Sequence, residues 1–174
     1  GQDPEDVLTE LSRVDPVKGR FQTIHSEKGV TGVVDYAHTP DALSNVLETI
    51  REVNVSGGEV ITIVGAGGNR DHGKRPLMAR IAVDGSHKVI LTSDNPRNED
   101  PERILDDMME GVPILARERV LRIVSREEAI RTACMLAKAG DIILLAGKGH
   151  EDYQVLGNNT IQFDDMLILK QNLN

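Results

Sequence analysis

Residues 59–71 read EVITIVGAGGNRD, a short apolar run that leads directly into a glycine-rich loop. A continuous run of β-branched and other apolar residues is typical of a strand that is buried on both faces of a parallel sheet. Glycines directly after such a strand allow the backbone to turn tightly before a helix begins. This stretch therefore predicts a strand, a loop and a helix in succession, with the helix beginning near Pro76.

The same alternation of strand and helix continues along the chain. Short apolar runs predict further strands over residues 88–92, 120–124 and 141–146. Apolar residues at helical spacing predict helices over residues 40–53, 101–110 and 126–138. Strands that alternate with helices predict a Rossmann-like, doubly wound α/β fold with a mostly parallel sheet.

Hairpins and short helices are expected at the two ends of this unit. Residues 21–26 and 31–36 flank a Glu27-Lys28-Gly29 turn and predict an N-terminal β-hairpin. Before it, residues 3–13 predict a short helix with an Asp cap, and residues 14–20 a linker. At the other end, apolar residues on both sides of Asn158-Asn159 predict a second hairpin, after which Asp164 is expected to cap a last helix.

Composition excludes several classes of function. A net charge of -8 and only two tyrosines, two phenylalanines and no tryptophan argue against nucleic acid as a partner. No stretch approaches the roughly 18 apolar residues of a membrane span, and the polar first residues do not form a signal peptide. Cys134 is the single cysteine, in a helical pattern, and is expected to fill the core in a reducing compartment. We therefore expect a cytoplasmic, monomeric protein that binds neither nucleic acid nor membrane.

Basic residues are concentrated in one segment of this acidic chain. Residues 69–80 contain four of them against one acid, Asp71, and they are Arg70, Lys74, Arg75 and Arg80. A local excess of positive charge suggests a small anionic ligand, whereas a solvated charged turn is the alternative.

Three of the predicted strands end in polar loops. These loops are residues 65–71, 93–97 and 147–152. In an open parallel sheet, ligands bind beyond the carboxyl ends of the strands, so the three loops are expected to meet at one edge. Their convergence predicts a binding site there.

The first loop partly resembles two nucleotide-binding motifs, the P-loop and the dinucleotide fingerprint, but matches neither. Residues 68–75 read GNRDHGKR, in which Arg75 stands where a P-loop has the hydroxyl that binds Mg²⁺. The spacing of Gly65, Gly67 and Arg70 lacks the third glycine of the dinucleotide fingerprint. We interpret the glycines as turn residues. The spacing of Asp35, His38, His72 and His150 matches no metal motif, so no metal site is expected.

The other two loops carry side chains of both charge signs. Arg97 is suited to a carboxylate, because its planar guanidinium forms paired hydrogen bonds, and Asn95 can orient the same ligand. Glu151 can receive an ammonium group, so the set suits an amino acid. The alternatives are an Asx-Pro turn at Asp94 with an exposed Arg97, and a Glu–Arg ion pair within the protein.

Four ordered motifs resemble the C-terminal domain of the Mur ligase family, the UDP-N-acetylmuramoyl-L-alanyl-D-glutamate ligases. They are VDYAHTPD at 34–41, GGNRDHGKRP at 67–76, DNPR at 94–97 and AGKGHEDYQ at 146–154. The resemblance runs from about residue 19 to residue 153. It implies an ATP-dependent amide ligase of three domains, in which the C-terminal domain brings the incoming amino acid and closes over the nucleotide.

The resemblance also implies roles for individual residues. The residues that would hold the amino acid are Arg70, Asn95, Arg97, Gly147 and Glu151. Those that would contact the ribose side of ATP are Arg20, Asp35 and His38. The D-N-P-R form is similar to that of members that use meso-diaminopimelate, whose second carboxylate L-lysine lacks.

The same resemblance implies that part of the enzyme lies outside this sequence. Because the chain begins with Gly1 and contains no P-loop, we expect residues 1–18 to be the tail of a central ATPase domain. Residues 19–174 would form the C-terminal domain, with no catalytic residue, inactive alone and with no cofactor bound. ATP and Mg²⁺ would be held mainly by the central domain, and UDP-N-acetylmuramoyl-dipeptide would be the other substrate. A lysine-adding or folylpolyglutamate synthase-like ligase and a free-standing amino-acid- or nucleotide-binding module are the alternatives.

Overall fold

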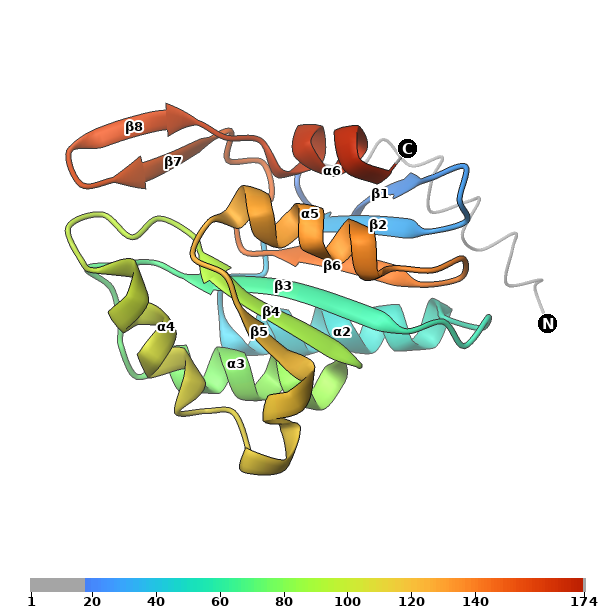
Figure 1. The fold of residues 1–174 in the computed structure, drawn as a ribbon, viewed down its shortest axis with the longest axis horizontal. Helices are drawn as coiled ribbons and strands as arrows, with labels where there is room; N and C mark the ends of the chain where they lie inside the picture. Colours follow the sequence, from blue (N-terminus) through green and yellow to red (C-terminus); the bar gives the residue numbers. More distant parts are fainter. Residues whose placement is uncertain (1–17, 174) are drawn as a thin grey trace.

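The computed structural model describes residues 18–173 as an α/β unit built on one main sheet (Figure 1). Within those residues the main sheet has six strands, in the order β1-β2-β6-β3-β4-β5. Their bounds are β1 (Gln22–His25), β2 (Thr31–Asp35), β3 (Val60–Ala66), β4 (Lys88–Ser93), β5 (Val120–Arg122) and β6 (Ile142–Ala146). The β1–β2 pair is antiparallel and every other neighbouring pair is parallel. The predicted fold class, including the N-terminal hairpin, is confirmed.

Helices cover both faces of this sheet. They are α2 (Pro40–Val53), α3 (Lys74–Gly85), α4 (Pro101–Met109), α5 (Arg126–Leu136) and α6 (Asp165–Leu173), with a 3-10 helix, η1 (Ile114–Arg119). Figure 1 shows α2, α3 and α4 on one side of the sheet and α5 and α6 on the other. A separate hairpin, β7 (Tyr153–Leu156) and β8 (Asn159–Gln162), joins β6 to α6.

Alternate residues of the strands supply two separate cores. On β6, Leu144 packs in the cluster with α2, α3 and α4, whereas Ile143 and Leu145 pack with α5 and α6. Successive side chains of a strand point to opposite faces, so a strand buried on both faces must be apolar throughout. This requirement explains the continuous apolar run of β6, and in β3 the one polar residue, Thr62, is hydrogen-bonded to Ser86.

Caps set the beginnings of several helices. The side chains of Thr39, Asp100 and Ser125 each accept a hydrogen bond from a backbone N–H in the first turn of α2, α4 and α5. Helix α3 begins at Lys74, before the expected Pro76, because proline is tolerated anywhere in the first turn of a helix.

Some expectations differ from the structure or fall outside it. Strand β5 ends at Arg122 rather than near Val124, although the N–H of Ile123 still donates to the carbonyl of Leu91. The 3-10 helix η1 was not predicted. The helix expected over residues 3–13 lies outside the described residues. In residues 18–173, no helix has the length and apolar content needed to cross a membrane.

The sheet order identifies the edge where a ligand would bind. From β3 the chain adds β4 and then β5 on one side, while β6 lies on the other side of β3. The strand order therefore reverses at the β3–β6 boundary, and in doubly wound sheets ligands bind at the carboxyl ends of the strands at such a point. The loops after β3, β4 and β6 all begin at this edge.

Candidate functional site: an edge of three loops

The loops after β3 and β4 are in direct backbone contact. The N–H of Gly68 donates to the carbonyl of Asn95 at 2.9 Å. A Cβ on Gly68 would lie 1.8 Å from the carbonyl oxygen of Pro96, so no other residue fits there without a shift of the backbone. This glycine lets the first loop lie against the second.

Asn95 joins the second loop to the third. Its side chain is buried, and its Nδ2 donates to Oε2 of Glu151 at 3.0 Å. The structure thus brings together the amide and the carboxylate that the sequence placed on separate loops. Besides this amide, Glu151 has the ammonium of Lys148 at 3.5 Å, and among residues 18–173 no arginine forms a salt bridge with it, which contradicts the alternative of a Glu–Arg ion pair.

Lys148 lies at the centre of this contact and was missed by sequence reasoning. Its side chain is fully buried, and its Nζ donates to Oδ1 of Asn95 at 3.2 Å and to the carbonyl of Tyr153 at 2.7 Å. The carboxylates of Asp94 and Glu151 lie 3.4 and 3.5 Å from the same nitrogen. A lysine between two glycines suggests a solvated loop. The sequence feature that could have indicated its burial is the presence of acidic residues on the neighbouring loops, because a buried lysine is rare unless it is paired.

Arg97 adopts a backbone conformation that is unusual for a residue with a side chain. Its φ is 53°, in the left-handed region. The β7 strand holds it there, because its N–H donates to Val155 and its carbonyl accepts from Gly157. Its Nη1 donates to the carbonyls of Gly68 and Asn95 at 3.0 and 3.2 Å, which points the guanidinium across the first loop. The alternative of a freely exposed Arg97 is therefore wrong.

Arg70 lies near Arg97, beside Gly67. A Cβ on Gly67 would be 3.0 Å from Nη1 of Arg97 and 3.5 Å from Cγ of Arg70, so the two arginines flank Gly67. Arg70 is exposed, whereas Arg97 is half-buried. Two cationic side chains thus stand beside the Asn95–Glu151 pair.

Gly147 connects this group to a second one. Its N–H donates to the carbonyl of Asp35 at 3.0 Å, at the end of β2. Arg20, Asp35 and His38 line a common hollow of about 430 Å³, so the structure brings the three predicted nucleotide-side residues together. Oδ2 of Asp35 accepts from the N–H of Phe21 at 2.7 Å, which uses one of the two carboxylate oxygens.

The basic segment after β3 serves the fold more than a ligand. Arg75 is buried, and its guanidinium donates to Glu99 and Asp107 at 2.8 Å each and to the carbonyl of Gly67 at 3.2 Å. Arg80 pairs with Asp84 on α3. Two of the four cations are therefore paired with carboxylates of the protein, so the suggested anionic ligand stays a prediction that depends on Arg70 and Lys74.

The pKa values of Tyr36 and Cys134 are both raised. Burial raises the pKa of Tyr36, and the nearby charges of Glu151, Tyr153 and Asp94 raise it further. Burial raises the pKa of the Cys134 thiol to about 11, so the thiolate is scarce at neutral pH. Cys134 packs against the α5–α6 core, as expected. Among residues 18–173, no group of three or more His, Cys, Asp or Glu side chains is arranged to hold a metal ion.

Comparison with known protein families identifies the family of this chain. Residues 19–149 match the model of the Mur ligase, glutamate ligase domain. The chain belongs to the Mur ligase family. The Mur ligase domain so defined contains the ends of β2, β3, β4 and β6, from which the described site is built.

Individual Mur ligases are similar over nearly all of the chain. It is 56% identical over 174 residues to a UDP-N-acetylmuramoyl-L-alanyl-D-glutamate--2,6-diaminopimelate ligase of Bacteroides thetaiotaomicron, covering 36% of that protein. The ligase of the same name from Listeria monocytogenes (serotype 4b) is 50% identical over 161 residues, which are 92% of this chain and 32% of the relative. The chain thus spans about a third of the length of the curated relatives it matches.

Two solved structures are similar to this chain, one at high and one at low sequence identity. A solved 2,6-diaminopimelate ligase has 43% identity and a TM-score of 0.83 over 99% of this chain and 35% of that chain. A folylpolyglutamate synthase from Thermotoga maritima matches with a TM-score of 0.59 at 19% identity, over 82% of this chain and 30% of its own. The second likeness shows the shared fold alone.

Proposed function

We propose that this chain is the C-terminal, amino-acid-binding domain of an ATP-dependent ligase that adds meso-diaminopimelate to the D-glutamate of UDP-N-acetylmuramoyl-L-alanyl-D-glutamate. The observation that carries the proposal is the contact between Asn95 and Glu151 beside Arg97. One edge of the sheet thereby offers a cation, amide donors and a carboxylate together, as a zwitterion requires. The diaminopimelate ligases at 50–56% identity support the choice of amino acid.

Each of the five residues has a distinct role in this proposal. Arg70 and Arg97 receive carboxylate oxygens of the amino acid, and Asn95 donates a further hydrogen bond. Glu151 and the Gly147 backbone receive ammonium groups. Holding the amino acid rigidly places its nucleophilic amine for attack, and such positioning lowers the entropic part of the barrier.

The nucleotide side of the proposal rests on the hollow lined by Arg20, Asp35 and His38. Only one oxygen of the Asp35 carboxylate accepts from the N–H of Phe21, so the other can accept from ribose hydroxyls. Arg20 adds positive charge in the same hollow. ATP, with its Mg²⁺, supplies the phosphoryl group that activates the D-glutamyl carboxylate. In our proposal, most of the nucleotide is held by a central domain of the full-length ligase, and this chain closes over its ribose.

Arg97 favours diaminopimelate over L-lysine. On the carbon that bears the distal ammonium group, diaminopimelate carries a second carboxylate where lysine has a hydrogen. Arg97 is half-buried and keeps its bonds to the carbonyls of Gly68 and Asn95, so the loss of the ligand's carboxylate should cost about 1–3 kcal/mol, which corresponds to roughly tenfold discrimination. We further propose that the ligase acts as a monomer in the cytoplasm, without nucleic acid or membrane partners.

The test is an amide-NMR titration of this chain with meso-diaminopimelate, with L-lysine as the control ligand. We expect shifts in the loops at residues 67–71, 94–97 and 147–151 with diaminopimelate and none with lysine. The matched variants are Arg97→Ala, which removes the proposed carboxylate contact, and Arg117→Ala, which removes an arginine of η1 outside those loops.

The outcomes separate the alternatives. Equal shifts with lysine would overturn the assignment of the amino acid. If neither ligand shifts the loops, the same titration is repeated in the full-length ligase with ATP bound. A second absence of shifts would overturn the site itself.

A further inference from the structure

The buried ammonium of Lys148 has no role in the proposed function, yet it touches two of its residues. We propose that Lys148 is a positioning residue, whose charge cancels that of Asp94 so that Glu151 keeps its place and charge for the ammonium group of the amino acid. The inference rests on the proposed function for the identity of the ligand. The contacts of Lys148 are within the protein and do not depend on the proposed function.

Lys148 ties together the loops that make the site. Its Nζ donates to Oδ1 of Asn95 on the β4 loop and to the carbonyl of Tyr153, where β7 begins. The same nitrogen is 3.4 Å from Oδ1 of Asp94 and 3.5 Å from Oε2 of Glu151. It therefore stands between two carboxylates that would otherwise repel each other at close range.

The amide of Asn95 is fixed by these contacts. Its Oδ1 accepts from Lys148 and from the N–H of Val155 at 3.0 Å, which uses both lone pairs. Its Nδ2 gives one hydrogen to Glu151. What Asn95 has left to offer a ligand is one N–H, so it recognises an acceptor such as a carboxylate and cannot receive an ammonium group.

The charges of the buried cluster do not balance without a ligand. The cluster consists of Asp94, Glu151, Asp165, Lys148 and Arg126, and Arg126 interacts electrostatically with all three acids. Among these five residues, three carboxylates against two cations leave one negative charge, and Arg97, which lies beside Asn95 on the other loop, is the proposed contact of the ligand's carboxylate. An ammonium group from the ligand neutralises it, and charge attraction in a partly buried site is screened little by solvent.

Removal of the Lys148 charge would leave Asp94 and Glu151 without the cation that lies between them. Asp94 and Glu151 would then separate, and the Asn95–Glu151 bond that spans the two loops would lengthen. Replacing Asp94 by a neutral amide would remove the repulsion again. A lysine that served only to fill space would show no such rescue.

The experiment compares three variants with the wild type in the full-length ligase: Lys148→Met, Asp94→Asn/Lys148→Met, and a control. The control is Lys88→Met, which removes the lysine of an exposed ion pair with Glu59 at the opposite end of β4. We expect Lys148→Met to raise the KM for diaminopimelate about tenfold or more, with the KM for ATP unchanged. The double variant should recover most of that loss, and Lys88→Met should match the wild type.

A second readout uses this chain without any ligand. In the wild type, the Lys148 ammonium protons should exchange slowly enough to be seen by NMR at neutral pH, because the group is fully buried and hydrogen-bonded. The side-chain N–H₂ signals of Asn95 should shift in Lys148→Met and return toward their wild-type positions in the double variant. If Lys148→Met does not fold, the wild-type signals and the double variant still test the proposal.

Two results would overturn it. One is a KM for diaminopimelate in Lys148→Met within about twofold of the wild type. The other is a double variant no better than Lys148→Met in either readout. If the wild-type ligase does not use diaminopimelate, the proposed function fails, while the Asn95 and Lys148 signals still decide the role of the lysine.

Discussion

At the scale of single residues, Arg97 combines a side chain that we propose binds the ligand with a strained backbone. A side chain in the left-handed region costs roughly 1–3 kcal/mol and persists where the surroundings enforce it. Here β7 enforces it, through the hydrogen bonds of Arg97 to Val155 and Gly157. Such strain is common at binding sites because it fixes the direction in which a side chain projects.

A pair of substitutions at Arg97 separates strain from binding. Arg97→Ala removes the side chain and keeps most of the strain, whereas Arg97→Gly removes both. Both variants should lose diaminopimelate binding, yet Arg97→Gly should unfold with a free energy about 1 kcal/mol higher than Arg97→Ala. Urea unfolding of the two proteins measures the difference. If Arg97→Gly is as stable as Arg97→Ala, or less stable, the backbone at position 97 is not strained.

The sequence was informative about residues whose chemistry suits a ligand and less so about residues that support them. Asn95, Arg97 and Glu151 follow predicted strands and differ in charge, so their convergence could be expected from topology. Lys148 and Arg75 could not be placed, because a cation in a glycine-rich loop looks the same in sequence whether it faces solvent or is buried. Burial depends on which carboxylates the other loops bring, and that is a tertiary property.

At the scale of elements, Glu99 joins the loop after β3 to the residues before α4. Its carboxylate accepts from the N–H of Asn69 and from Arg75 at the start of α3. Burial acts to raise the pKa of Glu99, but the Asn69 hydrogen bond, Arg75 and His72 outweigh it and lower the pKa below its ordinary value of 4.5. The ionised form is thus favoured in the folded protein.

The lowered pKa of Glu99 predicts a pH dependence of stability. A carboxyl with a lower pKa in the folded state stabilises the protein above its unfolded pKa, and this contribution is lost as the pH falls through the folded pKa. Glu99→Gln should therefore cost about 1 kcal/mol at pH 7 and should flatten the loss of stability below about pH 4.5. Urea unfolding between pH 3 and pH 7 measures both effects, with exposed Glu110→Gln as the control. An unchanged slope would contradict the role of Glu99.

The elements themselves were predictable where local rules decide them. The caps Thr39, Asp100 and Ser125 mark helix beginnings in the sequence, and the helix from Pro40 to Val53 was predicted at its observed bounds. The beginning of α3 was missed because a proline in a first turn does not mark the first residue. The 3-10 helix η1 was missed because it has no side-chain cap to mark it.

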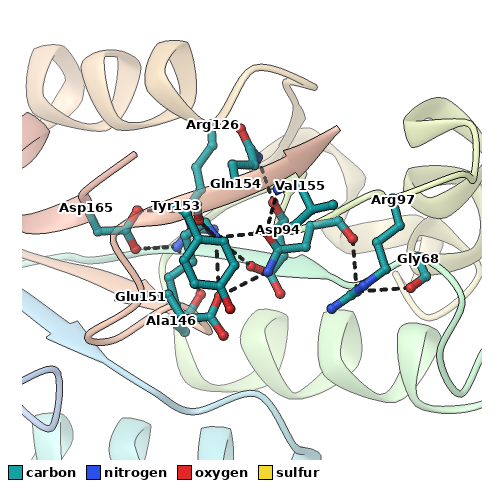
Figure 2. Close-up of polar contacts among 12 residues, drawn as sticks. Gly68, Asp94, Arg97, Arg126, Ala146, Glu151, Tyr153, Gln154, Val155 and Asp165 are labelled. Carbon is teal, nitrogen blue, oxygen red and sulfur yellow. Dashed lines mark hydrogen bonds and ion pairs between the residues drawn. The ribbon is translucent and has the colours of Figure 1, made fainter. Parts of the chain in front are cut away.

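At the scale of the whole molecule, one buried ion pair connects the second core to the binding edge. Arg126 on α5 donates through Nε and Nη2 to Asp165 on α6, at 2.8 and 2.6 Å, and through Nη2 to the carbonyl of Ala146 at 3.2 Å (Figure 2). Burial acts to lower the pKa of Arg126, but the attraction of Asp165 outweighs it and raises the pKa. The apolar pattern predicts two covered faces, but it gives no sign of a charged pair between α5 and α6.

Breaking this pair from one side should destabilise the whole molecule. Asp165→Asn leaves the guanidinium of Arg126 buried without its counter-charge, which should cost about 3 kcal/mol or more. The double variant Arg126→Met/Asp165→Leu removes both charges and should recover most of that loss. As a control, Arg131→Met on the exposed face of α5 should change stability by less than about 0.5 kcal/mol.

Urea unfolding of the four proteins measures these differences, and amide NMR of the double variant reports the positions of the loops. Because Arg126 also holds the carbonyl of Ala146, directly before Gly147, the double variant should shift the amides of residues 147–151 even where stability is restored. A loss below about 1 kcal/mol in Asp165→Asn would contradict a buried pair that stabilises the fold. Unshifted loop amides in the double variant would show that the pair does not position the binding edge.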